Sequence, residues 1–213
     1  MKHLAKVTII INCFNGENFI NDCISSVLAQ TYSNWELVFW DNLSTDNTAK
    51  ILKKFKDKRI KYFKAIKHTN LPNARNLALE KAKSDLIAFL DIDDTWHKDK
   101  LKYQVEEINK NQNFSFCYTK TKVIYEDLSP PQNKNQILSK ISTQFFSQKS
   151  KDRLLISNFI YFSSVLINQN LLSDKKLFND KYEQAEDYDL LLKLSSVGKV
   201  IYINKELTKY RIH

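Results

Sequence analysis

The stretch LIAFLDIDDT, at residues 86–95, decides the fold because five apolar residues run directly into three carboxylates. A short apolar run of this kind is typical of a strand buried on both faces, as in parallel sheets covered by helices. Ligands of such sheets bind at the carboxyl ends of the strands. Carboxylates crowded there repel one another unless a cation lies between them. The stretch therefore predicts a buried strand that ends at a site for a hard divalent ion.

Segments typical of strands and helices alternate over the first 110 residues. We expect buried strands at 7–11, 36–40, 60–63 and 86–90, and helices at 19–28, 49–55, 71–83 and 101–108. This alternation predicts an α/β fold with a mostly parallel central sheet flanked by helices.

The second half of the chain has a different pattern. Residues 114–125 alternate like an exposed pair of strands, and further strands are expected at 161–167 and 200–203. Prolines and polar residues between 127 and 151 favour a loop or lid. Acidic residues at Glu186 and just after it open a helix, where the helix dipole favours them. We find no internal repeat and no long linker, so the sequence predicts one domain over residues 1–213.

Composition excludes several kinds of site. The formal net charge of +9 permits acidic partners, although most lysines are scattered over presumed helix surfaces. Three cysteines without a Cys-x-x-Cys pair argue against a disulfide framework or a zinc knuckle, and favour reducing, intracellular surroundings. Only two glycines are present, which excludes a P-loop and the dinucleotide fingerprint. A bound nucleotide must therefore have its phosphates held in some other way.

We expect neither a secretory signal nor a membrane span. The first six residues lead directly into an apolar strand rather than into a longer apolar region. The longest uncharged run, from 154 to 173, has the length of a span but is interrupted by serine, asparagine and glutamine. A cytoplasmic location fits these features. The basic net charge would favour a peripheral contact with anionic lipid at the inner face of the cell membrane.

Polar groups follow three of the expected strands, and they should meet at one edge if the sheet is parallel. They are residues 12–15, Asp41 and residues 91–94, and the helix near 186 brings two further acids. Each has a simpler explanation: Asp41 as a turn residue, Ser44 and Asp46 as helix caps, and the two acids as helix N-terminal charge. The grouping, rather than any single residue, indicates a site.

Seven segments together resemble the family 2 glycosyltransferases, in the family's order and over nearly the whole chain. They are VTIIINCFN (7–15), SSVLAQTY (25–32), WDNLSTDNT (40–48), NARN (73–76), AFLDIDD (88–94), AEDYDL (185–190) and YRIH (210–213). The resemblance implies a GT-A fold, with a Rossmann-like nucleotide-sugar-binding half at 1–110 and an acceptor-side half at 111–213. It also implies transfer of a sugar from a nucleotide diphosphate, with inversion at the anomeric carbon.

The resemblance assigns roles to particular residues. The nucleotide-sugar site would comprise Asn12, Cys13, Phe14, Asn15, Asp41, Arg75, Asp91 and Ile92, with Asp41 at the base and Asp91 at the ribose. Mg²⁺ or Mn²⁺ on the diphosphate would be bound by Asp93 and Asp94, with His213 within reach. Asp187 matches the catalytic base. The family often has proline at the position of Asn12 and a second aspartate at that of Asn42, so base or sugar preference can differ here.

These roles agree with the chemistry of the reaction. A divalent ion stabilises the charge of a departing nucleotide diphosphate without a glycine loop. Inversion requires a carboxylate opposite the leaving group to take the proton of the acceptor hydroxyl. Asp189 is the competing base, but it would project about 200° around the helix from Asp187. We therefore favour Asp187.

The expected substrate is a UDP- or dTDP-sugar, and the expected acceptor is a hydroxyl of a glycan or lipid-linked molecule in cell-surface polysaccharide synthesis. Two other functions compete. Residues 91–95 also fit the nucleophile motif of haloacid dehalogenase-like, Mg²⁺-dependent phosphatases, although that motif belongs on a first strand. A non-catalytic basic module would need aromatic and basic residues interleaved on one exposed face. Neither explains the segments around Asn12 and Asp41.

Overall fold

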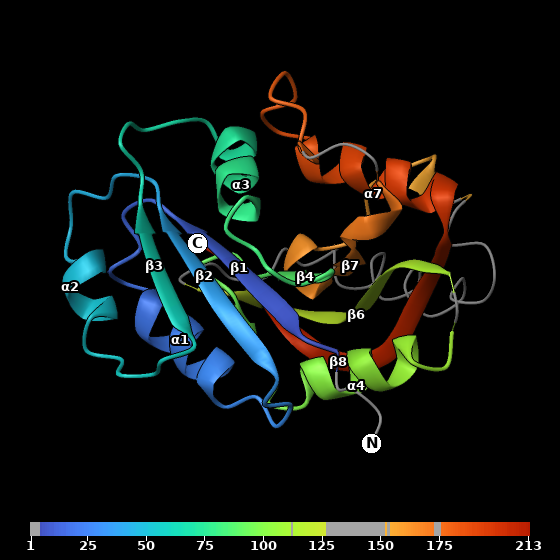
Figure 1. The fold of residues 1–213 in the computed structure, drawn as a ribbon, viewed down its shortest axis with the longest axis horizontal. Helices are drawn as coiled ribbons and strands as arrows, with labels where there is room; N and C mark the ends of the chain where they lie inside the picture. The colour runs from blue at the N-terminus through green and yellow to red at the C-terminus, as the bar shows by residue number, and fades with distance from the viewer. Residues whose placement is uncertain (1–4, 112, 127–151, 153, 173–175) are drawn as a thin grey trace.

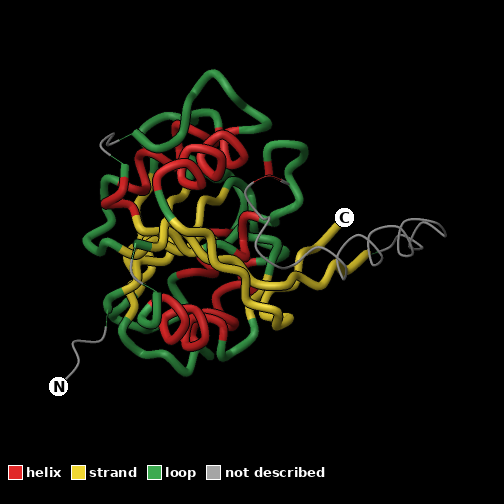
Figure 2. The backbone as a smooth tube through the Cα atoms, turned by 90° about the vertical axis from the view of Figure 1, so that its right-hand side faces the viewer, coloured by secondary structure: helices red, strands yellow, loops and turns green. Residues whose placement is uncertain are grey.

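The structure is a computed structural model that describes residues 5–111, 113–126, 152, 154–172 and 176–213. Within these residues, eight strands form one sheet in the order β3-β2-β1-β4-β7-β6-β8-β5 (Figure 1). Helices lie on both sides of the sheet, as the turned view shows (Figure 2). The predicted α/β fold with a mostly parallel central sheet is therefore confirmed.

The strands are β1 (Val7–Cys13), β2 (Trp35–Asp41), β3 (Ile60–Lys64), β4 (Leu86–Phe89), β5 (Thr95–Trp96), β6 (Phe114–Tyr125), β7 (Leu166–Asn168) and β8 (Lys199–Ile212). The helices are α1 (Ile20–Leu28), α2 (Thr48–Leu52), α3 (Leu71–Leu79), α4 (Lys100–Ile108) and α7 (Glu186–Val197), with short 3₁₀ helices η1 (Phe162–Ser164) and η2 (Gln169–Leu171).

The first four long strands are parallel, and their burial explains the continuous apolar runs of the sequence. β1 lies between β2 and β4, and β3 extends the sheet beyond β2. Alternate residues of β1 enter two separate cores: Ile9 and Ile11 pack with α1, α2 and α4, whereas Ile10 packs with α3 and α7. A strand that is covered on both faces has no solvent-exposed face, so its sequence is apolar at successive positions. The carboxyl ends of all four strands consequently lie at one edge.

The other half of the sheet reverses direction. β7 is antiparallel to both β4 and β6, while β6 and β8 are parallel. The expected strand at 161–167 was wrong: its first part forms η1, and the strand itself is Leu166–Asn168. The expected pair at 114–125 is a single strand whose first half is buried. The predicted loop or lid at 127–151 lies outside the described residues.

The last strand is much longer than the pattern predicted. β8 runs over Lys199–Ile212, where the sequence indicated only 200–203. The strand contains charged residues such as Lys205 and Glu206, so a prediction based on apolar runs does not detect its second half. Pairing with β6 reaches Tyr125 and Ile212, so the end of the chain returns to the site edge of the sheet. None of the helices in the described part of the chain is long and apolar enough to cross a membrane.

Candidate active site

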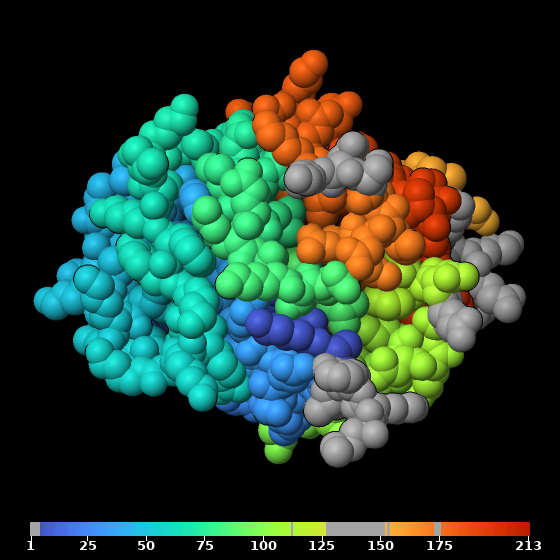
Figure 3. All heavy atoms as spheres, viewed as in Figure 1, coloured from blue at the N-terminus to red at the C-terminus, as the bar shows by residue number. Residues whose placement is uncertain are grey.

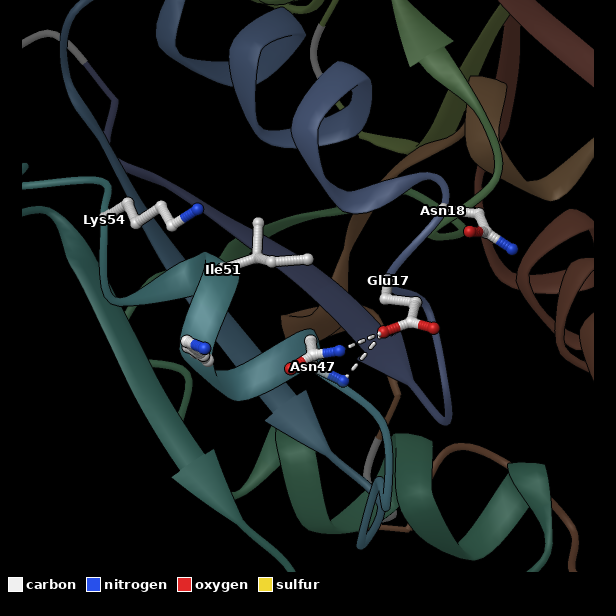
Figure 4. A pocket seen from close by; sticks show the side chains of 6 residues that line it. Glu17, Asn18, Asn47, Ile51 and Lys54 are labelled. Carbon is white, nitrogen blue, oxygen red and sulfur yellow. Dashed lines mark hydrogen bonds between the residues drawn. The ribbon is translucent and has the colours of Figure 1, made fainter.

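Two loops at the carboxyl ends of β1 and β2 are joined by reciprocal hydrogen bonds. The amides of Asn15 and Gly16 donate to the hydroxyls of Ser44 and Thr48, at 3.0 and 2.8 Å. On the neighbouring side, Glu17 Oε2 accepts from the amide and the side chain of Asn47, at 2.9 and 2.8 Å (Figure 4). Serine and threonine hydroxyls thus hold a tight backbone turn next to the ends of β1 and β2.

Asp41 organises the second of these loops from within. Its side chain is fully buried; Oδ1 accepts from the amide of Ser44 at 2.7 Å, and Oδ2 accepts from the Tyr62 hydroxyl at 2.6 Å. Burial of the Tyr62 ring raises the pKa of its phenol well above the usual value, and Asp41 raises it further because the phenol donates to a carboxylate. Asp41 therefore has two partners inside the protein.

The first loop packs directly on the acidic segment. A Cβ atom on Gly16 would lie 2.6 Å from Cys13 Sγ and 2.7 Å from Ile92 Cγ1, so only glycine fits there without displacement. Burial raises the pKa of the Cys13 thiol to about 12. This cysteine is consequently a neutral packing residue, and its sulfur and Ile92 fix the spacing between the ends of β1 and β4.

Asp91 is held between two elements. Its Oδ1 accepts from Arg75 Nη2 at 3.2 Å, and its backbone amide donates to the Ser163 hydroxyl at 3.0 Å. The carboxylate side chain is still 37% exposed, so it remains available to a ligand. Asn12, on the neighbouring strand, has a buried Nδ2 without a hydrogen-bond partner among the described residues.

The end of β8 closes the other side of the acidic segment. The Arg211 amide donates to Asp94 Oδ1 at 3.0 Å, and Arg211 Nε donates to the carbonyl of Asp93 at 2.8 Å. Arg211 also pairs with Glu126 and lies over the Phe19 ring. His213, two residues on, packs on the same ring, with 4.8 Å between ring centroids.

The carboxylates of this segment are destabilised as anions. Burial, followed by the neighbouring charge of Asp91, raises the pKa of Asp94 to about 8. The same two causes raise the pKa of Asp93, against the opposing charges of His213 and Arg211. Asp94 Oδ2 is buried without a hydrogen-bond partner in the described structure. The positive charges of Arg75 and Arg211 do not offset the burial of these carboxylates, and a divalent ion would supply further positive charge.

No group of three or more His, Cys, Asp or Glu side chains converges on a metal position within the described residues. Mg²⁺ and related ions are commonly bound through one or two carboxylates, with waters and substrate phosphates completing the shell. The residues at the end of β4 fit a metal of that kind, and do not fit a cage made by the protein alone.

The N-terminus of α7 brings the second set of acids. Glu186 is buried, and its Oε1 accepts from Arg75 Nη1 at 2.5 Å. Asp187 follows it; burial raises its pKa, the Arg75 charge lowers it, and Asp91 raises it further. Arg75 therefore lies between Glu186 and Asp91, and the three carboxylates share its electrostatic field. Asp189, in contrast, is paired with Lys193 at 2.6 Å on the helix surface.

Sequence reasoning missed several contacts of this site. Glu186 was noted as one of two acids at a helix start, but its partner Arg75 is 111 positions away and was not predicted. Arg211 lies in the YRIH segment without a predicted role, and Ser163 and Tyr62 carried no signal that distinguishes them from ordinary residues. Their contacts arise only because η1, β3 and β8 meet the ends of β1, β2 and β4.

A mostly parallel sheet whose carboxyl edge gathers acids, a guanidinium and hydroxyl-rich loops defines an α/β protein of the class that binds ligands at the carboxyl ends of its strands. The sequence profile of Glycosyl transferase family 2 matches residues 8–174. The chain is 35% identical over 208 residues to the Escherichia coli protein "UDP-Glc:alpha-D-GlcNAc-diphosphoundecaprenol beta-1,3-glucosyltransferase WfgD", covering 97% of this chain and 77% of that protein. It is 33% identical over 211 residues to an uncharacterized glycosyltransferase of Rickettsia felis. The chain belongs to glycosyl transferase family 2.

Solved structures show the same fold. The S. aureus protein TarS in complex with UDP superposes with a TM-score of 0.76 at 22% identity, covering 97% of this chain and 60% of that one. A mannosyltransferase of Pyrobaculum calidifontis, PcManGT, in complex with GDP-Man and Mn²⁺, gives 0.75 at 16% identity, covering 98% and 57%. The GT-A fold expected from the sequence is confirmed. The chain spans 33% of the length of the Rickettsia felis relative, and so corresponds to one part of some larger relatives.

The buried pair between Arg75 and Glu186 can be tested by a double-mutant cycle on stability. Arg75→Leu leaves Glu186 buried without its partner, so it should lower the free energy of unfolding by about 3–5 kcal/mol. Glu186→Leu should cost a similar amount, and the double variant less than the sum of the two. Urea unfolding measures all three. Additive losses would show that the pair is not coupled.

The raised pKa of Asp94 predicts a pH dependence of stability in metal-free protein. Between pH 4 and 8 the folded state retains a proton that the unfolded state has released, so the unfolding free energy should fall as pH rises. The slope from one such group is at most about 1.4 kcal/mol per pH unit. Asp94→Asn should flatten this part of the curve. The exposed Asp85→Asn is the control, and an equal flattening by it would contradict the assignment.

Proposed function

We propose that this protein is a metal-dependent, inverting glycosyltransferase that transfers a hexosyl group from a UDP- or dTDP-sugar to a hydroxyl of a glycan or lipid-linked acceptor. One observation carries the proposal. Arg75 bonds to Asp91 at the end of β4 and to Glu186 at the start of α7, which brings Asp187 into the electrostatic reach of Asp91. A donor-side carboxylate and a candidate base thereby flank one site.

The nucleoside would be bound by the ends of β1 and β2. Residues 12–15 would contribute one side of this site, and Ile92 packs against the adjoining Gly16. Phe14 is 50% exposed and contacts His68 with 4.4 Å between ring centroids, so an aromatic surface is available to a base. Because both oxygens of Asp41 already accept hydrogen bonds, a base contact there would use a remaining lone pair or replace the Tyr62 hydroxyl.

Asp93 would be the principal metal ligand. Its backbone carbonyl accepts from Arg211 Nε at the end of β8, and the charges of His213 and Arg211 oppose the rise in its pKa. Asp94 would contribute its unpartnered Oδ2 or, through Arg211, hold the turn in place. A bound Mg²⁺ or Mn²⁺ would neutralise the negative charge that develops on the departing nucleotide diphosphate.

Asp187 would act as the general base. In an inverting displacement the acceptor oxygen attacks the anomeric carbon from the face opposite the diphosphate, and its proton passes to a carboxylate on that side. Asp187 Oδ1 accepts from the amide of Tyr188 at 2.6 Å, which fixes the carboxylate at the start of α7. Burial raises the pKa of Asp187, which makes its carboxylate a stronger proton acceptor than an exposed aspartate. Asp189 is already paired with Lys193, which supports the choice between them.

The relatives support the substrate class. WfgD is named as using UDP-Glc and a diphosphoundecaprenol-linked acceptor, and TuaG of Bacillus subtilis is named for teichuronic acid biosynthesis. We therefore infer a role in cell-surface polysaccharide synthesis at the cytoplasmic side of a membrane. We also propose that residues 1–110 bind the nucleotide sugar and 111–213 the acceptor, within one domain. Family membership removes the reason to prefer a phosphatase or a basic module.

Donor binding can be measured by thermal shift against UDP, dTDP and GDP, with and without Mn²⁺. UDP or dTDP should raise the melting temperature only in the presence of metal, because the metal would bind the diphosphate to the protein. A ligand that binds only the folded state stabilises it by about 2.7 kcal/mol at a hundredfold excess over Kd. Asp93→Asn should lose the metal-dependent part of the shift. The control is Asp85→Asn. A full metal-dependent shift in Asp93→Asn would remove Asp93 from the metal site.

The base is tested by Asp187→Asn in a transfer assay with UDP-sugar and a lipid diphosphate acceptor. Donor binding should be retained, whereas kcat should fall by about 10²–10⁴-fold because the acceptor proton has no receiving group. Asp189→Asn, two residues further along the same helix, is the matched control and should retain transfer. Full activity of Asp187→Asn would show that another group is the base.

A further inference from the structure

Three large apolar side chains are exposed in the loops at the site edge of the sheet. Ile66 is 101% exposed, Leu71 42% and Tyr182 48%. We call these three residues the apolar rim. Single exposed apolar residues are ordinary on protein surfaces, but a group of them at one edge is a feature to be explained.

The rim comes from two segments that lie on the same side of the molecule. Ile66 belongs to the connection between β3 and α3, Leu71 is the first residue of α3, and Tyr182 lies in the segment that precedes α7; both segments project upward in Figure 1. Asn70 joins them, because its Nδ2 donates to Glu183 Oε1 at 3.1 Å and to the Asp180 carbonyl at 3.3 Å. In the space-filling view the teal and orange segments stand at the upper edge (Figure 3).

The tip that carries Ile66 is anchored at both ends. The amide of Ala65 donates to the Asp41 carbonyl at 2.8 Å. Asn42 Nδ2 donates to the Thr69 carbonyl at 2.7 Å, and Asn70 caps α3. A protruding isoleucine on a fixed loop cannot easily fold back onto the protein. The structure thus presents this side chain to the surroundings.

The charge around the rim is positive. Residues 60–71 and 176–185 together hold five lysines and two carboxylates. Lys64 and Lys67 flank Ile66, and Lys181 precedes Tyr182; all three are exposed. Aliphatic and tyrosine tips interleaved with lysine match the interface of an anionic bilayer, where apolar side chains enter the acyl boundary and lysines meet headgroups.

We propose that the apolar rim docks the protein on an anionic phospholipid bilayer, with the carboxyl edge of the sheet turned toward the membrane. The inference rests on the proposed function to the extent that this orientation brings the site to a lipid-linked acceptor. The connection that carries Ile66 begins at Ala65, whose amide donates to the Asp41 carbonyl, so docking through Ile66 turns the end of β2 toward the membrane. The two separate tips, rather than a continuous apolar groove, favour a deformable lipid surface over a folded protein.

Vesicle co-sedimentation tests the proposal with the whole chain. Phosphatidylcholine vesicles containing phosphatidylglycerol should bind the protein, and pure phosphatidylcholine vesicles should bind it much more weakly. Ile66→Asp with Tyr182→Asp should lower the partition coefficient at least about tenfold. Lys67→Gln should lower it about fivefold, because one lysine near an anionic surface is removed.

Matched controls separate the rim from general changes of charge or hydrophobicity. Ile156→Asp replaces another isoleucine, 84% exposed, outside the rim, and Lys53→Gln removes an exposed lysine of the α2 region. Both should bind vesicles as the wild type does. Equal losses in the controls, or no sedimentation of wild type with anionic vesicles, would overturn the proposal.

A nucleotide thermal shift on the same preparations distinguishes the two levels of inference. If the protein binds vesicles but UDP and dTDP do not shift its melting temperature, the proposed transferase function is contradicted and the proposed membrane docking is supported. If the metal-dependent shift in melting temperature is normal but no vesicles are bound, the transferase function is supported and the membrane docking is contradicted.

Discussion

The arrangement of the site depends on one buried guanidinium. Arg75 is almost fully buried on α3, and it bonds to Glu186 at the start of α7 and to Asp91 at the end of β4. Its guanidinium lies over the rings of Phe162 and Phe178. A charge withdrawn from water in this way needs satisfied partners, and the partners it has are acids from two distant parts of the chain. Satisfying Arg75 thereby fixes the spacing across the site.

The return of β8 imposes a second constraint on the acidic segment. Arg211 binds the backbone of Asp93 and a carboxylate oxygen of Asp94, so the turn after β4 is shaped by the end of the chain. Burial then makes the ionised carboxylates unfavourable, as the pKa of about 8 for Asp94 records. The protein holds acids at a place where water alone stabilises them poorly. Positive charge brought by a donor's metal ion would relieve that cost.

The features of the candidate site gather at one edge of the sheet. Parallel strands β1, β2, β3 and β4 end there, and the loops that follow them supply hydroxyl groups, carboxylates and the exposed tip at Ile66. A rigid sheet beneath these loops lets the site be built from short, fixed turns. Serine, threonine and asparagine side chains tie these turns together by hydrogen bonds.

The sequence by itself determined the parallel half of the fold and the chemistry of its edge, because buried strands carry continuous apolar runs and the acids follow them directly, as at Asp91. It also favoured Asp187 over Asp189, since helical spacing separates their directions. Only the tertiary structure decided the course of β8 and the partners of Arg75 and Asp94. A strand with charged residues has no apolar pattern to reveal it, and a contact between Arg75 and Glu186, 111 positions apart, exists only once α3 and α7 pack on the same face of the sheet.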